Sequence, residues 1–301
     1  MKTNRDLIDG IQSGDFLSLA RVLTIVENEL PGSDQLLRNL QVRNDVPVIG
    51  ITGPPGAGKS TLVNALIDRL VHGDYKVAVL AVDPTSPFNM GSLLGDRIRM
   101  SSHFNNPAVY IRSVATRGSV GGLSAKIIEM TDALKASVFD YIILETVGVG
   151  QSELEIAGLA DKTVVVLVPE AGDDIQHIKS GLMEIADAFV VNKSDREGAD
   201  AFANGLIKML HGRTTQVPVF KTVASKAEGI DELVSWINNS KEINGMRSYL
   251  YAEKAFKLIQ NRRMVDISKH DLLKKVELES QKADFSIYRF IDNYLSSLSA
   301  H

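Results

Sequence analysis

The sequence of 301 residues contains no cysteine. This absence excludes disulfide bonds, thiolate metal sites and cysteine nucleophiles, and it suits a reducing compartment. An excess of charge of one sign is also missing, because 33 Lys and Arg residues stand against 37 Asp and Glu residues, a net charge of −4. So neutral a chain lacks the basic pattern typical of binding to duplex DNA or an anionic membrane. We therefore expect neither nucleic acid nor a membrane among its partners.

Long hydrophobic runs are missing as well. The longest apolar stretches, such as residues 164–168, cover about a quarter of a membrane span. The first fifteen residues lack the apolar core of a signal peptide. These absences predict a cytoplasmic protein, and the chain, with 44% apolar residues, is long enough to close a large hydrophobic core.

Apolar spacing divides the chain into three parts. Residues 1–45 have apolar positions at helical intervals and form a predicted N-terminal helical arm. In residues 46–240, short runs that are apolar throughout alternate with helical stretches, which is typical of strands buried on both faces. This alternation predicts an α/β fold with a mostly parallel, doubly wound sheet and right-handed crossovers. Residues 241–301 return to helical spacing and form a predicted C-terminal helical extension.

A phosphate-binding motif follows the first strand-like run. The pattern G-x-x-x-x-G-K-S is matched by Gly53-Pro-Pro-Gly56-Ala57-Gly58-Lys59-Ser60-Thr61, which leads into an amphipathic helix. Glycines let backbone N–H groups approach phosphate oxygens, and the helix N-terminus adds the positive end of its dipole. Lys59 is predicted to contact the β- and γ-phosphates, and the Ser60 hydroxyl to bind Mg²⁺. The motif and its context predict a nucleoside triphosphate site.

The identity of the base is predicted from Asn192-Lys193-Ser194-Asp195, which follows a later apolar run. A carboxylate at Asp195 can accept hydrogen bonds from both N1–H and the 2-amino group of guanine. Adenine offers neither donor and would leave the carboxylate unpaired, which is costly in a buried site. The backbone N–H of Ala224, after the last strand-like run, is the candidate donor to guanine O6. The predicted ligand is therefore GTP or GDP.

Two acids, Asp83 and Glu145, each end or follow a strand-like run. Ligands of open α/β sheets lie at the carboxyl ends of the strands, so both carboxylates are predicted to meet the Mg²⁺ or its waters beside Ser60. Gly148 is placed so that its N–H can meet the γ-phosphate. The next residue is Val149 rather than a glutamine that could orient water, which predicts slow intrinsic hydrolysis accelerated by a partner.

Together with several longer stretches, these motifs resemble the MeaB/ArgK-type GTPases. These P-loop GTPases are chaperones of adenosylcobalamin-dependent methylmalonyl-CoA mutase. The resemblance covers roughly residues 1–300, and it departs from the family where many members have Ser-Ala and this chain has Val223-Ala224. Its motifs are GPPGAGKST (53–61), VDPTSP (82–87), GSLLGDRIRM (91–100), RGSVGGL (117–123), ETVGVGQSE (145–153), AGDDIQHIKSGLMEIAD (171–187) and NKSD (192–195).

The resemblance implies a GTP-hydrolysing chaperone that gates adenosylcobalamin loading and protects or reactivates methylmalonyl-CoA mutase or a related acyl-CoA mutase. It also implies a homodimer held by the C-terminal helices. Catalytic roles fall by motif on Lys59, Asp83, Asp96 and Glu145, of which Asp96 rests on the family pattern alone.

A loop that looks like the family's third switch contains Asp173, Gln176 and Lys179. The resemblance implies that this loop relays the nucleotide state to the mutase. Mg²⁺ and GTP or GDP are the implied ligands, and bound cobalamin is not predicted.

The nearest alternative function is a GTPase metallochaperone that delivers a metal ion to a metalloenzyme. Such proteins usually display Cys or His clusters, whereas this chain has no cysteine and its six histidines lie far apart in the sequence. An RNA-binding GTPase would need a basic face, which the charge balance does not suggest. A pure interaction module is disfavoured by the full set Lys59, Ser60, Glu145 and Asp195.

Overall fold

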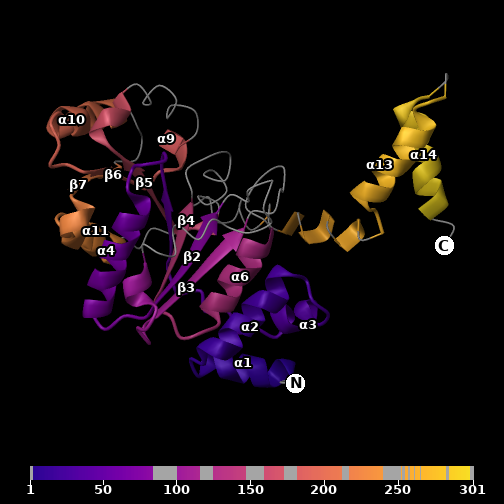
Figure 1. Cartoon of the computed structure of the whole chain (residues 1–301), viewed down its shortest axis with the longest axis horizontal. Helices are drawn as coiled ribbons and strands as arrows, with labels where there is room; N and C mark the ends of the chain where they lie inside the picture. Colours follow the sequence, from indigo (N-terminus) through magenta and orange to yellow (C-terminus); the bar gives the residue numbers. More distant parts are fainter. Residues whose placement is uncertain are drawn as a thin grey trace. The chain divides into compact units, whose positions relative to one another are not determined.

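The computed structural model forms two compact units, Met1–Arg247 and Ser248–His301 (Figure 1). It describes residues 3–83, 100–115, 125–146, 159–172, 182–211, 217–239, 252, 255–256, 258–260, 262–264, 266–282 and 285–298.

A seven-stranded sheet lies at the centre of the first unit, with the strand order β3-β2-β4-β1-β5-β6-β7. All neighbouring strands are parallel. Strands β1, β4, β5 and β6 are buried along their whole length, because helices cover both faces of the sheet. The predicted α/β fold with a parallel, doubly wound sheet is confirmed. The strands are β1 (Val48–Thr52), β2 (Val77–Asp83), β3 (Val109–Ala115), β4 (Tyr141–Thr146), β5 (Lys162–Leu167), β6 (Ala188–Asn192) and β7 (Val219–Thr222).

Three hydrophobic clusters join these strands to the helices. On one face, α4 (Lys59–His72) and α11 (Ile230–Asn239) pack on the centre of the sheet. On the other face, α1 (Asn4–Gln12), α2 (Phe16–Glu27), α3 (Ser33–Arg38) and α6 (Ala125–Lys135) cover β2 and β4, whereas α9 (Leu182–Ile185) and α10 (Ala199–Leu210) cover β5 and β6. Figure 1 shows α1–α3 beside α6. Single-turn helices are η1 (Ser101–His103), η2 (Pro169–Gly172) and η3 (Ala224–Lys226).

The N-terminal helices are fastened to the sheet by polar contacts as well as by the core. Arg112 on β3 donates to the carbonyl oxygen of Ala20 and to the hydroxyl of Thr24, and it pairs with Glu27. Helix α1 begins at a capping box in which Thr3 and its partner three residues later exchange hydrogen bonds. Helices α1–α3 therefore belong to the same compact unit as the sheet, and the domain limits at residues 45 and 240 stay predictions.

The second unit contains α13 (Lys269–Glu279) and α14 (Ile287–Leu298), preceded by short helical pieces. Many large apolar side chains are exposed in it, namely Phe256, Ile259, Met264, Leu273, Leu278, Ile287, Tyr288, Ile291 and Leu295. Across the described parts of both units, no helix is both long enough and apolar enough to span a membrane.

Candidate functional site

The loop between β1 and α4 depends on glycine at two positions. Gly53 has φ +140°, and a Cβ there would lie 2.1 Å from the carbonyl oxygen of Val166. Gly58 has φ +87°, and a Cβ there would lie 2.4 Å from Nδ2 of Asn192. Gly56 is also left-handed, at φ +78°. Only glycine fits both the conformation and the space at Gly53 and Gly58, so the local sequence and its surroundings together shape this loop.

Lys59 is the first residue of α4 and is buried. Its ammonium group donates to the carbonyl oxygens of Gly53, at 2.8 Å, and Pro54, at 3.0 Å. The charge is therefore held within the loop, close to the N-terminus of α4. Because the N-cap residue of α4 is Gly58, it has no side chain with which to cap the first-turn N–H groups. First-turn N–H groups and a buried cation together suit an anion such as phosphate.

A buried hydroxyl–carboxylate pair lies beside the loop. Oγ of Ser60, in the first turn of α4, donates to Oε1 of Glu145 at the end of β4, with a distance of 2.6 Å. Hard oxygen donors of this kind suit Mg²⁺, which typically takes one or two carboxylates together with substrate phosphates. The residues present therefore fit the predicted metal. The structure brings Ser60 and Glu145 together as the sequence predicted.

Asp83 is the last residue of β2, which pairs directly with β4. The backbone of Asp83 therefore lies at the same end of the sheet as Glu145. The side chain of Asp83 is outside the described part of the structure. Asp96, Gly148 and the loop residues Asp173, Gln176 and Lys179 also lie outside them. Their roles stay predictions.

Asn192 connects the phosphate loop to the loop after β7. Its Nδ2 donates to the carbonyl oxygen of Ala57 at 2.9 Å, and its Oδ1 accepts from the hydroxyl of Thr222 and the backbone N–H of Ala224, both at 3.1 Å. Every one of these side-chain bonds is buried. Asn192 thus holds two loops together through protein contacts. The N–H of Ala224, predicted to donate to guanine O6, donates to Asn192 here, and its role toward a base stays a prediction.

The rest of the base-reading motif lies at the surface. Lys193 has φ +56°, and its ammonium donates to the carbonyl oxygen of Gly56 at 2.8 Å. The carboxylate of Asp195 accepts from the ammonium of Lys226 at 3.2 Å. This hydrogen bond is the main reason that the pKa of Asp195 lies below its ordinary value, and Arg196 lowers it further. Asp195 is therefore an ionised acceptor, as guanine recognition requires.

Some contacts near the site were not foreseen from the sequence. The hydroxyl of Thr146 donates to that of Thr52 at 3.0 Å, and both are buried. Thr52 immediately precedes the phosphate loop and Thr146 immediately follows Glu145. These neighbouring positions are the signal from which the pair could have been predicted. Lys226 stood in the segment that supplies Ala224 but carried no predicted role. No pattern in the sequence indicated that Lys226 would face Asp195.

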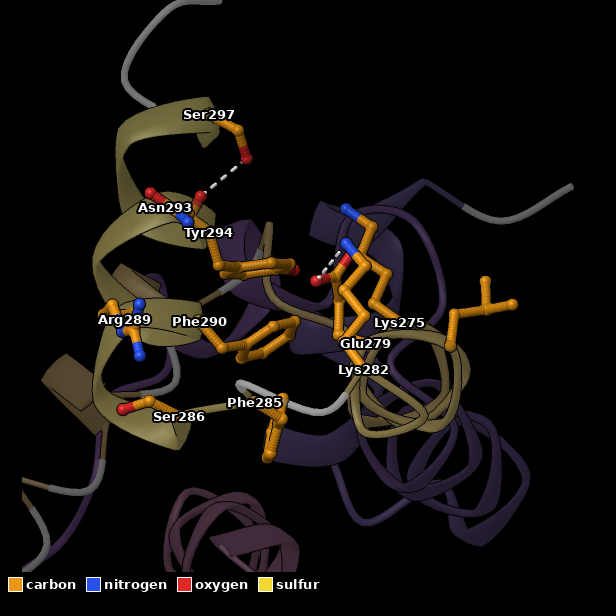
Figure 2. Close-up of a pocket in the computed structure, with 11 residues that line it drawn as sticks. Lys275, Glu279, Lys282, Phe285, Ser286, Arg289, Phe290, Asn293, Tyr294 and Ser297 are labelled. Atoms are coloured by element: carbon orange, nitrogen blue, oxygen red, sulfur yellow. Dashed lines mark hydrogen bonds and ion pairs between the residues drawn. The ribbon is translucent and has the colours of Figure 1, made fainter.

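A separate hollow of about 480 Å³ lies between α13 and α14 in the second unit (Figure 2). Phe290 and Tyr294 line it from α14, and Lys275 lies over the ring of Tyr294, 4.7 Å from its centroid. Lys282 pairs with Glu279 at the rim. No predicted site residue belongs to this hollow. Within the described ranges, no group of three or more His, Asp and Glu side chains is arranged to hold a metal ion.

Comparison with known proteins gives matches over most of the chain. A family model described as the methylmalonyl-CoA mutase-associated GTPase MeaB matches residues 19–281. A predicted GTPase of Pyrococcus abyssi is 46% identical over 245 residues, which are 79% of this chain and 76% of that protein. A fused isobutyryl-CoA mutase of Geobacillus kaustophilus is 36% identical over 241 residues, which are 73% of this chain and 22% of that protein.

A solved structure has a similar fold over nearly the whole chain. It is that of an LAO/AO transport system kinase, with a TM-score of 0.70 and 26% identity, covering 99% of this chain and 98% of the other. The likeness therefore extends over both units.

Proposed function

Because this chain belongs to the MeaB family of methylmalonyl-CoA mutase-associated GTPases, we propose that it hydrolyses GTP with Mg²⁺ to gate adenosylcobalamin loading onto an acyl-CoA mutase. Methylmalonyl-CoA mutase is the proposed partner, and protection or reactivation of that enzyme is part of the proposal. The observation that carries the nucleotide site is the side chain of Asn192, which binds the phosphate loop and the loop of Ala224 at once. One nucleotide can therefore span both loops.

Each proposed role follows from the contacts that the site residues make. On phosphate binding, Lys59 would exchange the carbonyl oxygens of Gly53 and Pro54 for phosphate oxygens, since its ammonium already lies beside the loop. Ser60 and Glu145 would hold Mg²⁺. A bound Mg²⁺ supplies electrostatic stabilisation of the transferred phosphoryl group.

The proposed mutase partner is supported by the fused relative. In that protein, a segment similar to this chain makes up 22% of a fused isobutyryl-CoA mutase. A regulator and its enzyme that share one chain are held at high effective concentration, which is consistent with a working partnership. We propose that Asp173, Gln176 and Lys179 relay the nucleotide state to such a partner.

The proposed homodimer is supported by the exposed apolar side chains of the second unit. Tyr288 is 78% exposed, Leu278 is 68% and Phe256 is 65%, and large apolar side chains left in water favour burial against a partner. Light scattering at micromolar protein concentration tests the oligomeric state. A mass near twice 32.8 kDa is expected, and a mass near that of one chain would contradict the dimer.

The main experiment measures GTP turnover with and without purified methylmalonyl-CoA mutase. We expect slow turnover alone and faster turnover with the mutase. Lys59→Ala should lower both rates by about 100-fold or more, because the phosphate charge loses its buried cation. Lys221→Ala, which changes an exposed lysine paired with Asp200, is the matched control.

The outcomes separate the two parts of the proposal. Turnover that survives Lys59→Ala would overturn the nucleotide site. Turnover that the mutase fails to stimulate would contradict the chaperone role and leave the GTPase intact.

A further inference from the structure

The loop that faces Asp195 is held rigidly by its own backbone. Val223 and Glu228 exchange two backbone hydrogen bonds, of 3.1 and 3.3 Å. Within this bridge, the N–H of Lys226 donates to the carbonyl oxygen of Val223 at 2.8 Å. Gly229 closes the loop at φ +74°, where a Cβ would lie 2.1 Å from the carbonyl oxygen of Lys221. The backbone position of Lys226 is therefore set independently of its side chain.

The loop that carries Asp195 is joined to this one. Strands β6 and β7 are neighbours in register, with Asn192 opposite Thr222. Beyond the strands, the N–H of Ser194 donates to the carbonyl oxygen of Thr222 at 3.0 Å. The backbones on both sides of the Asp195–Lys226 pair are thus fixed, which reduces the entropy lost when the two side chains meet.

From this geometry we propose that Lys226 is a positioning residue for guanine recognition, holding the Asp195 carboxylate in place to receive the base. The proposal rests on the proposed function, in which Asp195 accepts from guanine N1–H and the 2-amino group. A carboxylate offers about four acceptor positions. It can therefore keep the ammonium of Lys226 on one of them and receive both guanine donors on others.

The ammonium has two effects on the carboxylate. Its bond to Oδ2 limits rotation of the Asp195 side chain, which is half-exposed and would otherwise sample several orientations. Its charge, with a smaller contribution from Arg196, keeps the pKa of Asp195 below the ordinary value. Lys226 therefore acts on guanine through Asp195, without touching the base itself.

The test measures the dissociation constant of GDP by calorimetry for Lys226→Met and the wild type. An exposed ion pair predicts a loss of affinity of about two- to fivefold, restored by Lys226→Arg and reduced in 0.5 M salt. Lys221→Met is the matched control, because the side chain of this exposed lysine pairs with a different carboxylate, that of Asp200, at a distance of 2.8 Å. GDP affinity in that variant should match the wild type.

A second arm asks whether the effect runs through the carboxylate. The Asp195→Asn variant is titrated with xanthosine diphosphate (XDP). The side-chain amide of this variant can donate to the 2-carbonyl of xanthine while it accepts from N1–H. Adding Lys226→Met to that variant should change XDP affinity by less than about twofold, because no carboxylate charge remains to be held. On acidification, GDP binding by Lys226→Met should weaken at a higher pH than wild-type binding, because the pKa of Asp195 rises when Lys226 is removed.

Unchanged or tighter GDP binding by Lys226→Met would overturn the proposal, the second result meaning that Lys226 competes with guanine. An equal loss in the XDP arm would also overturn it, because the effect would then bypass the carboxylate. A wild-type chain that does not bind GDP would instead refute the proposed function.

Discussion

The side chain of Asn192 is a point at which a small change should strongly lower stability. Replacing it in Asn192→Ala removes three buried hydrogen bonds, to the carbonyl oxygen of Ala57, the hydroxyl of Thr222 and the N–H of Ala224. Asn192 itself is 2% exposed, so water cannot easily take its place. Three groups that were satisfied in the folded chain lose their partner.

The magnitude follows from these contacts. A buried hydrogen bond contributes about 1 kcal/mol net, and a buried polar group left without a partner costs about 1–3 kcal/mol. With three bonds removed, we expect the free energy of unfolding to fall by about 3–5 kcal/mol. GDP affinity should fall as well, because Ala57 and Ala224 are no longer held at a fixed separation.

The assay is urea denaturation of the nucleotide-free chain followed by tryptophan fluorescence. Trp236 is the only tryptophan in the sequence and lies on α11, so the signal reports the first unit alone. Asn238→Ala is the matched control, since exposed Asn238 on the same helix accepts one bond, from the hydroxyl of Tyr141. That variant should lose about 1 kcal/mol or less. A loss in Asn192→Ala no greater than the control's would refute the reasoning.

Three further changes test interactions in the first unit, the first two of them beside the site. Thr146→Val removes the hydroxyl that donates to Thr52, and denaturation should show a loss of about 1 kcal/mol; an unchanged midpoint would show that the pair adds nothing. Gly53→Ala places a Cβ 2.1 Å from the carbonyl oxygen of Val166 in a left-handed conformation, so we expect more than about 3 kcal/mol of destabilisation or insoluble expression, and a stable variant would contradict this. Burial raises the pKa of Asp187, so the contribution of this carboxyl group to the stability of the wild type should fall as pH rises from about 3.5 through the raised pKa; Asp187→Asn should lack that fall, and its stability relative to the wild type should be greater at pH 7 than at pH 3.5.

Much of the fold could be predicted because its signals are local. Buried parallel strands need continuous apolar runs, and the runs at 48–52 and 141–145 became β1 and most of β4. Glu145 was expected beside Ser60, at a shared Mg²⁺, because ligands lie at the carboxyl ends of parallel strands, and the two side chains are hydrogen-bonded to each other. The packing of the N-terminal helical arm was harder to predict, because apolar spacing shows that a helix has a buried face but not which surface covers it.

The sequence by itself determined the phosphate-binding motif, the parallel sheet and the family. Each depends on residues that are consecutive or regularly spaced, and backbone conformation responds to such patterns directly. Only the tertiary structure decided that Arg112 fastens α2 to β3, that Asn192 joins two loops, and that Lys226 faces Asp195. Those contacts join positions about 30 to 135 residues apart, and they form because packing brings their strands and loops together, which no spacing along the chain encodes.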